Sequence, residues 1–84
     1  MKMNTGIDVV AAFNPMGEIK PVYIRLVDEN HIPQTYKLEV NNSKPEKYSG
    51  INSILYDCSF FKDNLKQEIK IRYYIDSHKW AEIN

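Results

Sequence analysis

The sequence predicts an all-β fold, and three observations support this prediction. The chain has ten isoleucines and six tyrosines but only three alanines, and β-branched and aromatic residues favour strands whereas alanine favours helices. Hydrophobic and polar residues alternate with a period of two in five segments, which is typical of strands with one buried face. Proline, glycine and asparagine gather between these segments, where tight turns are expected.

The first two strands are expected over residues 7–13 and 22–26. Residues 13–21, F-N-P-M-G-E-I-K-P, join them. Asn14 can hydrogen-bond its own backbone at the start of a turn, and Gly17 can supply the left-handed residue that closes a hairpin loop. A phosphate-binding loop would instead need several glycines leading into a helix. We therefore interpret this segment as a turn.

The third and fourth strands are expected over residues 36–40 and 54–61. Residues 28–34 contain aspartate, asparagine and proline and are interpreted as a hairpin loop. Residues 41–52 form the longest segment predicted to be irregular, and this loop, which carries Tyr48, is the only connection long enough to shape a groove.

The fifth strand is expected over residues 69–75, and a short last strand over residues 79–83. A helix over residues 63–74 is the alternative, because apolar residues recur every four positions from Leu65. That helix would leave Ile71 on its polar side, so alternation explains more residues and favours the strand.

Five or six short strands without a crossover helix predict one domain over residues 1–84, a small antiparallel barrel. We expect an SH3-like barrel first and an OB-like barrel second. The inward phase of the alternation defines the predicted core, which consists of Val9, Ala11, Phe13, Val22, Ile24, Leu26, Leu38, Val40, Ile54, Tyr56, Cys58, Phe60, Ile69, Ile71 and Tyr73.

A set of spaced residues resembles a family pattern. It consists of Phe13, the G-x-I-x-P stretch from Gly17 to Pro21, Tyr36-x-Leu38-x-Val40, Gly50 followed by Tyr56, and a closing Trp80. This pattern resembles a loose group of short bacterial proteins of unknown function that look like small SH3-like barrels. The similarity covers about residues 9–84. This sequence departs from the group's pattern in the closing strand, which reads W-A-E-I. The resemblance implies the fold and no activity.

Charge and cysteine content limit the classes of function and the compartment. Eleven basic and eleven acidic residues give a net charge of zero, so no long-range field attracts polyanions. The single cysteine, Cys58, excludes an internal disulfide and fits a reducing compartment. Asp8 interrupts the short apolar run near the N-terminus, so a signal peptide is not expected. No segment approaches the ~20 apolar residues of a membrane span. We expect a cytoplasmic protein that does not enter a membrane.

Catalysis is not expected from the residues that could support it. Cys58 has the same phase as Tyr56, which predicts a buried core residue, whereas a nucleophilic cysteine needs an electropositive, partly exposed setting. His31 and His78 lie in predicted turns without a carboxylate spaced to orient either ring. One cysteine and two separated histidines cannot form a closed four-ligand metal site. The sequence therefore predicts neither an enzyme nor a cofactor.

A binding module is the expected class, with two alternatives for its partner. Small barrels bind peptides in aromatic-lined grooves or by strand addition at an open edge, and a protein or peptide partner is the first expectation. Weak, sequence-tolerant binding of single-stranded nucleic acid by the outward face of the fifth strand is the second. Glu68 lies among the cations of that face and would weaken the binding by repelling the phosphates. The candidate binding residues are Lys66, Lys70, Arg72 and Tyr74 on the fifth strand, and Tyr23 and Arg25 on the second.

Overall fold

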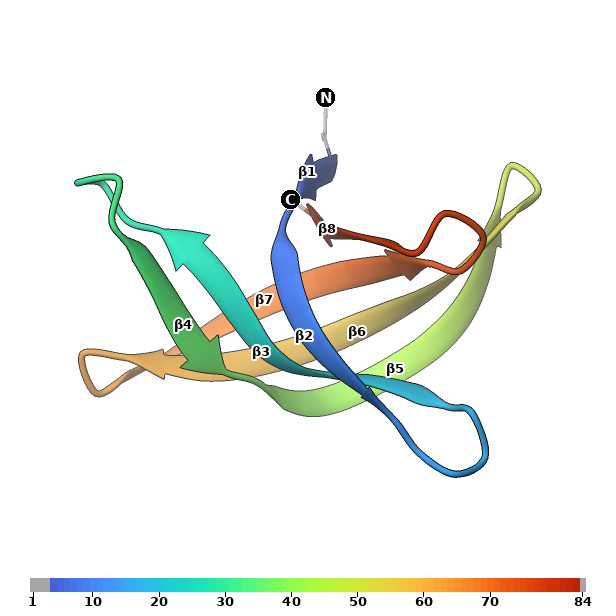
Figure 1. Cartoon of the computed structure of the whole chain (residues 1–84), viewed down its shortest axis with the longest axis horizontal. Helices are drawn as coiled ribbons and strands as arrows, with labels where there is room; N and C mark the ends of the chain where they lie inside the picture. The colour runs from blue at the N-terminus through green and yellow to red at the C-terminus, as the bar shows by residue number, and fades with distance from the viewer. Residues whose placement is uncertain (1–3, 84) are drawn as a thin grey trace.

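The computed structural model describes residues 4–83 and divides them into eight β-strands with no helix among them (Figure 1). The strands are β1 (Asn4–Gly6), β2 (Asp8–Phe13), β3 (Ile19–Val27), β4 (Pro33–Lys37), β5 (Glu39–Tyr48), β6 (Ile51–Lys62), β7 (Leu65–Tyr74) and β8 (Lys79–Ile83). No helix that could cross a membrane is found within these residues. The all-β prediction is confirmed.

The strands form two antiparallel sheets. One sheet has the order β1-β8-β7-β6-β5 and the other the order β2-β3-β4. A single residue, Ile7, joins β1 to β2, and Leu38 joins β4 to β5. The chain thus passes from one sheet into the other twice without a loop, and the three-stranded sheet crosses the five-stranded one (Figure 1). The sequence predicted five or six strands and the structure has eight, because the strand expected over residues 36–40 is divided between the two sheets at Leu38, and β1 precedes the first expected strand.

The prediction of an irregular segment over residues 41–52 is wrong. β5 continues to Tyr48 and β6 begins at Ile51, and the turn between them uses Ser49 and Gly50 with φ of 49° and 81°. Pro45 is tolerated in this strand because β5 lies at the edge of its sheet and pairs with β6 alone. The loop expected to shape a groove is therefore a long edge strand.

The alternative of a helix over residues 63–74 is also wrong, since β7 is a strand from Leu65 onward. The turn before it places Asp63 and Asn64 at φ of 52° and 64°. Two successive positive φ values are the mark of the tight hairpin turns whose twist matches that of antiparallel strands. This turn brings β7 back against β6 along its whole length.

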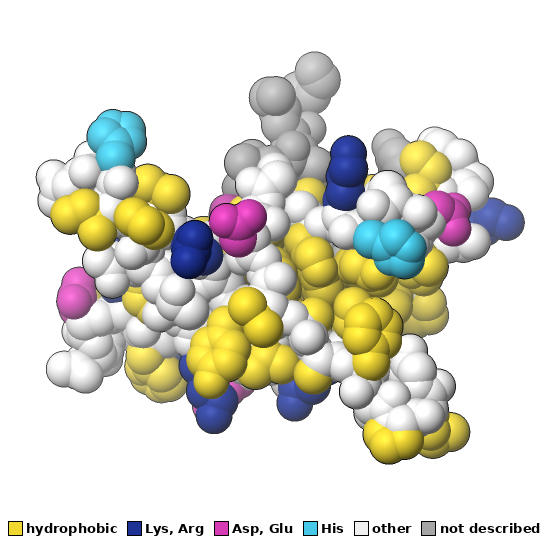
Figure 2. Space-filling view, viewed as in Figure 1, with side chains coloured by type: hydrophobic (Ala, Val, Ile, Leu, Met, Phe, Trp, Pro, Cys, Tyr) yellow, Lys and Arg dark blue, Asp and Glu magenta, His cyan; other side chains and the backbone are white. Residues whose placement is uncertain are grey.

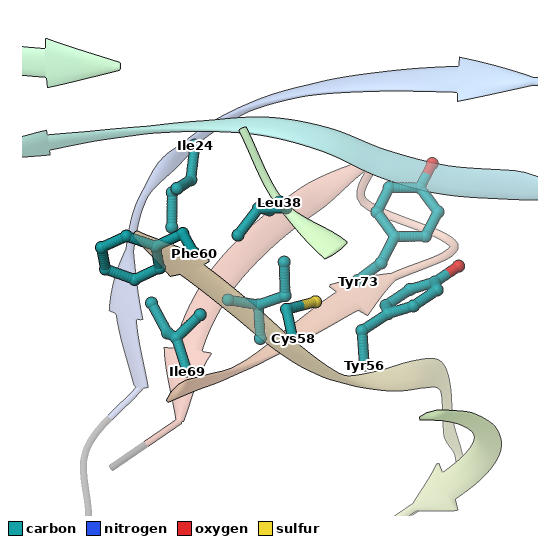
Figure 3. Packing of buried hydrophobic residues seen from close by; sticks show 8 residues of the cluster. Ile24, Leu38, Tyr56, Cys58, Phe60, Ile69 and Tyr73 are labelled. Carbon is teal, nitrogen blue, oxygen red and sulfur yellow. The ribbon is translucent and has the colours of Figure 1, made fainter. Parts of the chain in front are cut away.

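The core lies between the two sheets and is formed mainly by β6 and β7. Its side chains point toward one another from both sheets (Figure 3). Ala81 is also buried and was not predicted, because it lies beyond the five alternating segments. Eight buried core residues were predicted correctly: Ile24, Leu38, Tyr56, Cys58, Phe60, Ile69, Ile71 and Tyr73.

Phe13, predicted as a core residue, is 66% exposed. It lies near the tip of the β2–β3 hairpin, which extends past the crossing of the two sheets (Figure 1). A bulge also shifts the alternation of β3. Ala11 pairs with Pro21 but Val10 pairs with Tyr23, so Val22 is the extra residue. The bulge reverses the phase of the strand, and both Pro21 and Ile24 are buried although they are three residues apart.

The turn predicted between the first two strands is confirmed. The side-chain Oδ1 of Asn14 accepts hydrogen bonds from the backbone N–H groups of Met16 and Glu18, each at 2.9 Å. Gly17 has φ of 84°, and its N–H donates to the carbonyl oxygen of Asn14 at 2.9 Å. The segment is a hairpin turn held by the Asn14 side chain.

Replacing Gly17 with valine is expected to lower the free energy of unfolding by about 1 kcal/mol or more, because a β-branched residue is strained at positive φ. Gly6→Ala is the control, since Gly6 lies in a strand without positive φ and an added Cβ would meet nothing within 4 Å. Urea unfolding measures both variants. Equal stability of Gly17→Val and the parent chain would contradict the role assigned to Gly17.

Candidate functional site

β2 is an open strand edge whose only charged residue is the first, Asp8. It pairs with β3 on one side, and no described strand pairs with it on the other. Its residues 9–13 read V-V-A-A-F, without a charge or a proline. Proteins usually guard such edges with lysine, proline or a covering segment, because free backbone groups there pair readily with another chain. Residues 9–13 of β2 contain neither lysine nor proline, and no described strand pairs along their free side.

The pattern of hydrogen bonds shows which backbone groups face this edge. The N–H of Asn14 donates to the carbonyl oxygen of Glu18 at 3.0 Å, so the next pair, Phe13 and Ile19, does not exchange hydrogen bonds within the hairpin. The alternation makes Ala11 and Pro21 a second such pair, which agrees with the missing N–H of proline. The N–H and C=O groups of Ala11 and Phe13 therefore point away from β3.

Two hollows that share His78 lie at the two ends of this edge, one lined by Phe13 and the other by Asp8 and Val9, and we call them together the edge groove. The first, about 430 Å³, opens under the hairpin tip, and the second, about 470 Å³, lies between the start of β2 and β8. Figure 2 shows hydrophobic side chains between the hairpin and the β7–β8 turn. Those of the first hollow include Phe13, Pro45, Ile54, Tyr56, Tyr73 and Ile75.

Aromatic rings support the groove. The Trp80 ring lies 4.7 Å from that of Tyr73 and 5.7 Å from that of Tyr56, measured between centroids. The Tyr56 hydroxyl donates to the carbonyl oxygen of Ile19 at 2.6 Å and so fastens the hairpin to the five-stranded sheet. Burial raises the pKa of Tyr56, so its hydroxyl stays protonated as a donor. The Tyr73 hydroxyl lies 2.8 Å from Nδ1 of His78.

The basic row predicted on the fifth strand lies on the outer face of β7. Lys66 and Lys70 are exposed there. The Arg72 side chain is only 16% exposed, and its Nη2 lies 2.6 Å from Oε1 of Glu46. Desolvation opposes the ionisation of Glu46, but the hydrogen bond from Arg72 keeps the pKa of this carboxyl below its ordinary value. Arg72 is therefore committed to an ion pair within the protein.

The structure separates the predicted binding residues into two groups. Tyr74 belongs to the same strand as Lys70 and Arg72, whereas Tyr23 and Arg25 lie on β3 in the other sheet. The sequence could not place β3 relative to β7, because the order of strands depends on pairing between distant segments. The residues of the edge groove were not among the predicted site residues. The available signal was the pair Val10 and Ala12, which interrupts the alternation and leaves residues 9–13 without a polar residue.

Cys58 is unfavourably placed to act as a nucleophile. Cys58 is buried in the core, and burial, with a smaller contribution from the Asp57 carboxylate, raises the pKa of its thiol to about 11. The thiolate that a nucleophilic cysteine needs is therefore scarce at neutral pH. Among residues 4–83, no three histidine, cysteine, aspartate or glutamate side chains gather as a metal site would require.

The chain matches no protein-family model, no curated protein and no solved structure. The candidate site must therefore be judged on the geometry and chemistry of its own residues.

Proposed function

We propose that the protein is a non-catalytic binding module that takes up an extended peptide as an added strand along β2. One observation carries the proposal: an open edge, without charge or proline over residues 9–13, ends beside a groove lined by aromatic and aliphatic side chains. In strand addition, backbone hydrogen bonds supply affinity and pockets for alternate side chains supply specificity. The edge of β2 offers free backbone groups for hydrogen bonds, and the edge groove offers pockets for side chains.

The proposed binding mode follows from the phase of β2. A peptide strand beside β2 would bond to the free N–H and C=O groups of Ala11 and Phe13. Every second side chain of this peptide would point to the inner side of the sheet, where the edge groove lies. We expect these positions to be apolar, because Phe13, Tyr56 and Ile75 line the first hollow.

We propose further that the architecture is a small SH3-like barrel. The bends at Ile7 and Leu38, which carry the chain directly between the sheets, support this reading. So does the resemblance of the Phe13, Gly17 to Pro21 and Trp80 pattern to short bacterial barrels. We also propose a cytoplasmic location, which a lone unpaired cysteine fits.

The test is a titration with synthetic peptides of about eight residues in which valine or phenylalanine alternates with threonine. We expect the amide signals of Ala11 and Phe13 to shift and the fluorescence of Trp80 to change. Ala11→Pro should abolish binding, because it removes an N–H that faces the peptide but none that bonds to β3. Ala12→Pro is the matched variant, since it removes a hydrogen bond within the hairpin and should instead lower stability.

Two outcomes would contradict the proposal. Peptide binding that survives Ala11→Pro unchanged, in a folded variant, would show that the β2 edge is not used. Concentration-dependent dimerisation that Ala11→Pro abolishes would assign the edge to a second copy of the chain instead of a foreign peptide.

A further inference from the structure

The outer face of the three-stranded sheet presents a tyrosine among basic side chains. The register places Val10, Tyr23 and Lys37 in one row across the sheet. The next row contains Asp8, Arg25 and Thr35, and Lys20 lies opposite Ala12. The rows that alternate with these hold buried or half-buried residues such as Ile24 and Tyr36. The exposed rows therefore form the outer face, and we call it the β3 face.

The cations of the β3 face are not neutralised by ion pairs. Within the part of the chain that the structure describes, Lys20, Arg25 and Lys37 lie within 4.0 Å of no carboxylate, whereas Arg72 and Lys44 both pair with Glu46. The rows that define this face contain one acidic residue, Asp8. A chain of zero net charge thus carries a local excess of positive charge on this sheet.

We propose that the β3 face binds single-stranded nucleic acid. Tyr23 is 40% exposed, and an exposed ring lets a base stack whatever its identity. Lys37 lies directly across the sheet from Tyr23, and Arg25 is two residues along the same strand, so both can reach phosphates that flank a stacked base. Lys20 extends the row of cations toward the hairpin tip. The proposed peptide lies along the β2 edge, whereas this surface is the outer face of the sheet; the two share Asp8, which also lines the second hollow of the edge groove.

The chemistry sets the expected salt dependence. Neutralising three phosphates of a single strand gives a slope of about −2 in log affinity against log salt. Affinity should therefore fall about 100-fold between about 20 mM and about 200 mM salt. A peptide bound through backbone hydrogen bonds and apolar contacts would show little such dependence.

The experiment measures the anisotropy of a fluorescein-labelled oligothymidylate of about ten nucleotides at both salt concentrations. Tyr23→Ser should weaken binding at least about fivefold, because base stacking on an aromatic ring is lost. Arg25→Ser combined with Lys37→Ser should flatten the salt dependence. Asp8→Asn should tighten binding about two- to fivefold, since it removes the carboxylate opposite Arg25. All four positions are exposed, so the variants are expected to fold, which their amide spectra would verify.

Two controls make the assignment specific. Lys66→Ser with Lys70→Ser on β7 removes two exposed cations from the other sheet and should leave the affinity unchanged. Inorganic polyphosphate carries the charge without bases and should compete poorly. The proposal is overturned by absence of binding at low salt, by loss of binding in the β7 variant, or by equal competition from polyphosphate.

Discussion

Replacing Ile71 with alanine is expected to lower the free energy of unfolding by about 2–5 kcal/mol, because the change removes buried methyl groups and leaves a cavity. Ile71 is 0% exposed. It lies in the middle of β7, directly opposite Tyr56 on β6, where the two sheets enclose the core. Urea unfolding followed by Trp80 fluorescence would measure the loss. A domain of this size has only about 5–15 kcal/mol to lose.

Ile75→Ala is the matched control for this prediction. It makes the same chemical change four residues further along the chain, where the side chain is 39% exposed. Less surface returns to water there and little cavity is left, so the loss should be well under half of that at Ile71. Equal losses at the two positions would contradict the deeper burial of Ile71 relative to Ile75.

The sequence predicted the strands from residue 54 onward well, because their alternation is regular. Ile69, Ile71 and Tyr73 repeat every second residue, and a strand shifted by one residue would move all three to the polar face. The same periodicity decided correctly between strand and helix for this segment. The alternation of buried and exposed positions within the segment was sufficient to identify this strand, because it depends on neighbouring residues alone.

Features that depend on distant pairing were not predicted. Residues 41–48 are polar and contain Pro45, yet they form a strand because β6 offers a partner along nearly the whole segment. The bulge at Val22 reverses the phase of β3 and allows Pro21 to be buried. Phe13 fits the inward phase, but the hairpin extends beyond the surface that would cover it. None of these three features can be read from the local alternation of hydrophobic and polar residues.

The edge groove was not predicted, whereas the β3 face was predicted in part, because only its outward positions are encoded locally. The outward positions of Tyr23 and Arg25 followed from alternation, and both are exposed on one sheet face. Their separation from Lys70 and Arg72 follows from the order of strands, which alternation does not encode. The ion pair between Arg72 and Glu46 joins residues 26 positions apart, and it engages one of the three cations that the nucleic-acid prediction placed on β7.

Replacing Trp80 with alanine is expected to lower the free energy of unfolding by about 2–4 kcal/mol, less than for a fully buried tryptophan because this ring is half-buried. The ring is packed against those of Tyr56 and Tyr73, and each aromatic pair adds to the loss. The two tyrosines line the edge groove. We therefore expect Trp80→Ala to weaken peptide binding as well as stability.

Trp80→Phe separates the two effects. Phenylalanine keeps an aromatic ring against Tyr56 and Tyr73, so most of the stability should return, with a residual loss below about 1.5 kcal/mol. Because both variants lack the fluorescent tryptophan, unfolding would be followed by circular dichroism and peptide binding by the amide signal of Phe13. If the alanine variant were as stable as the parent chain, the claim that Trp80 stabilises the groove by packing against Tyr56 and Tyr73 would be wrong. If the alanine variant lost stability but bound peptide with full affinity, the packing of Trp80 against Tyr56 and Tyr73 would have no part in peptide recognition.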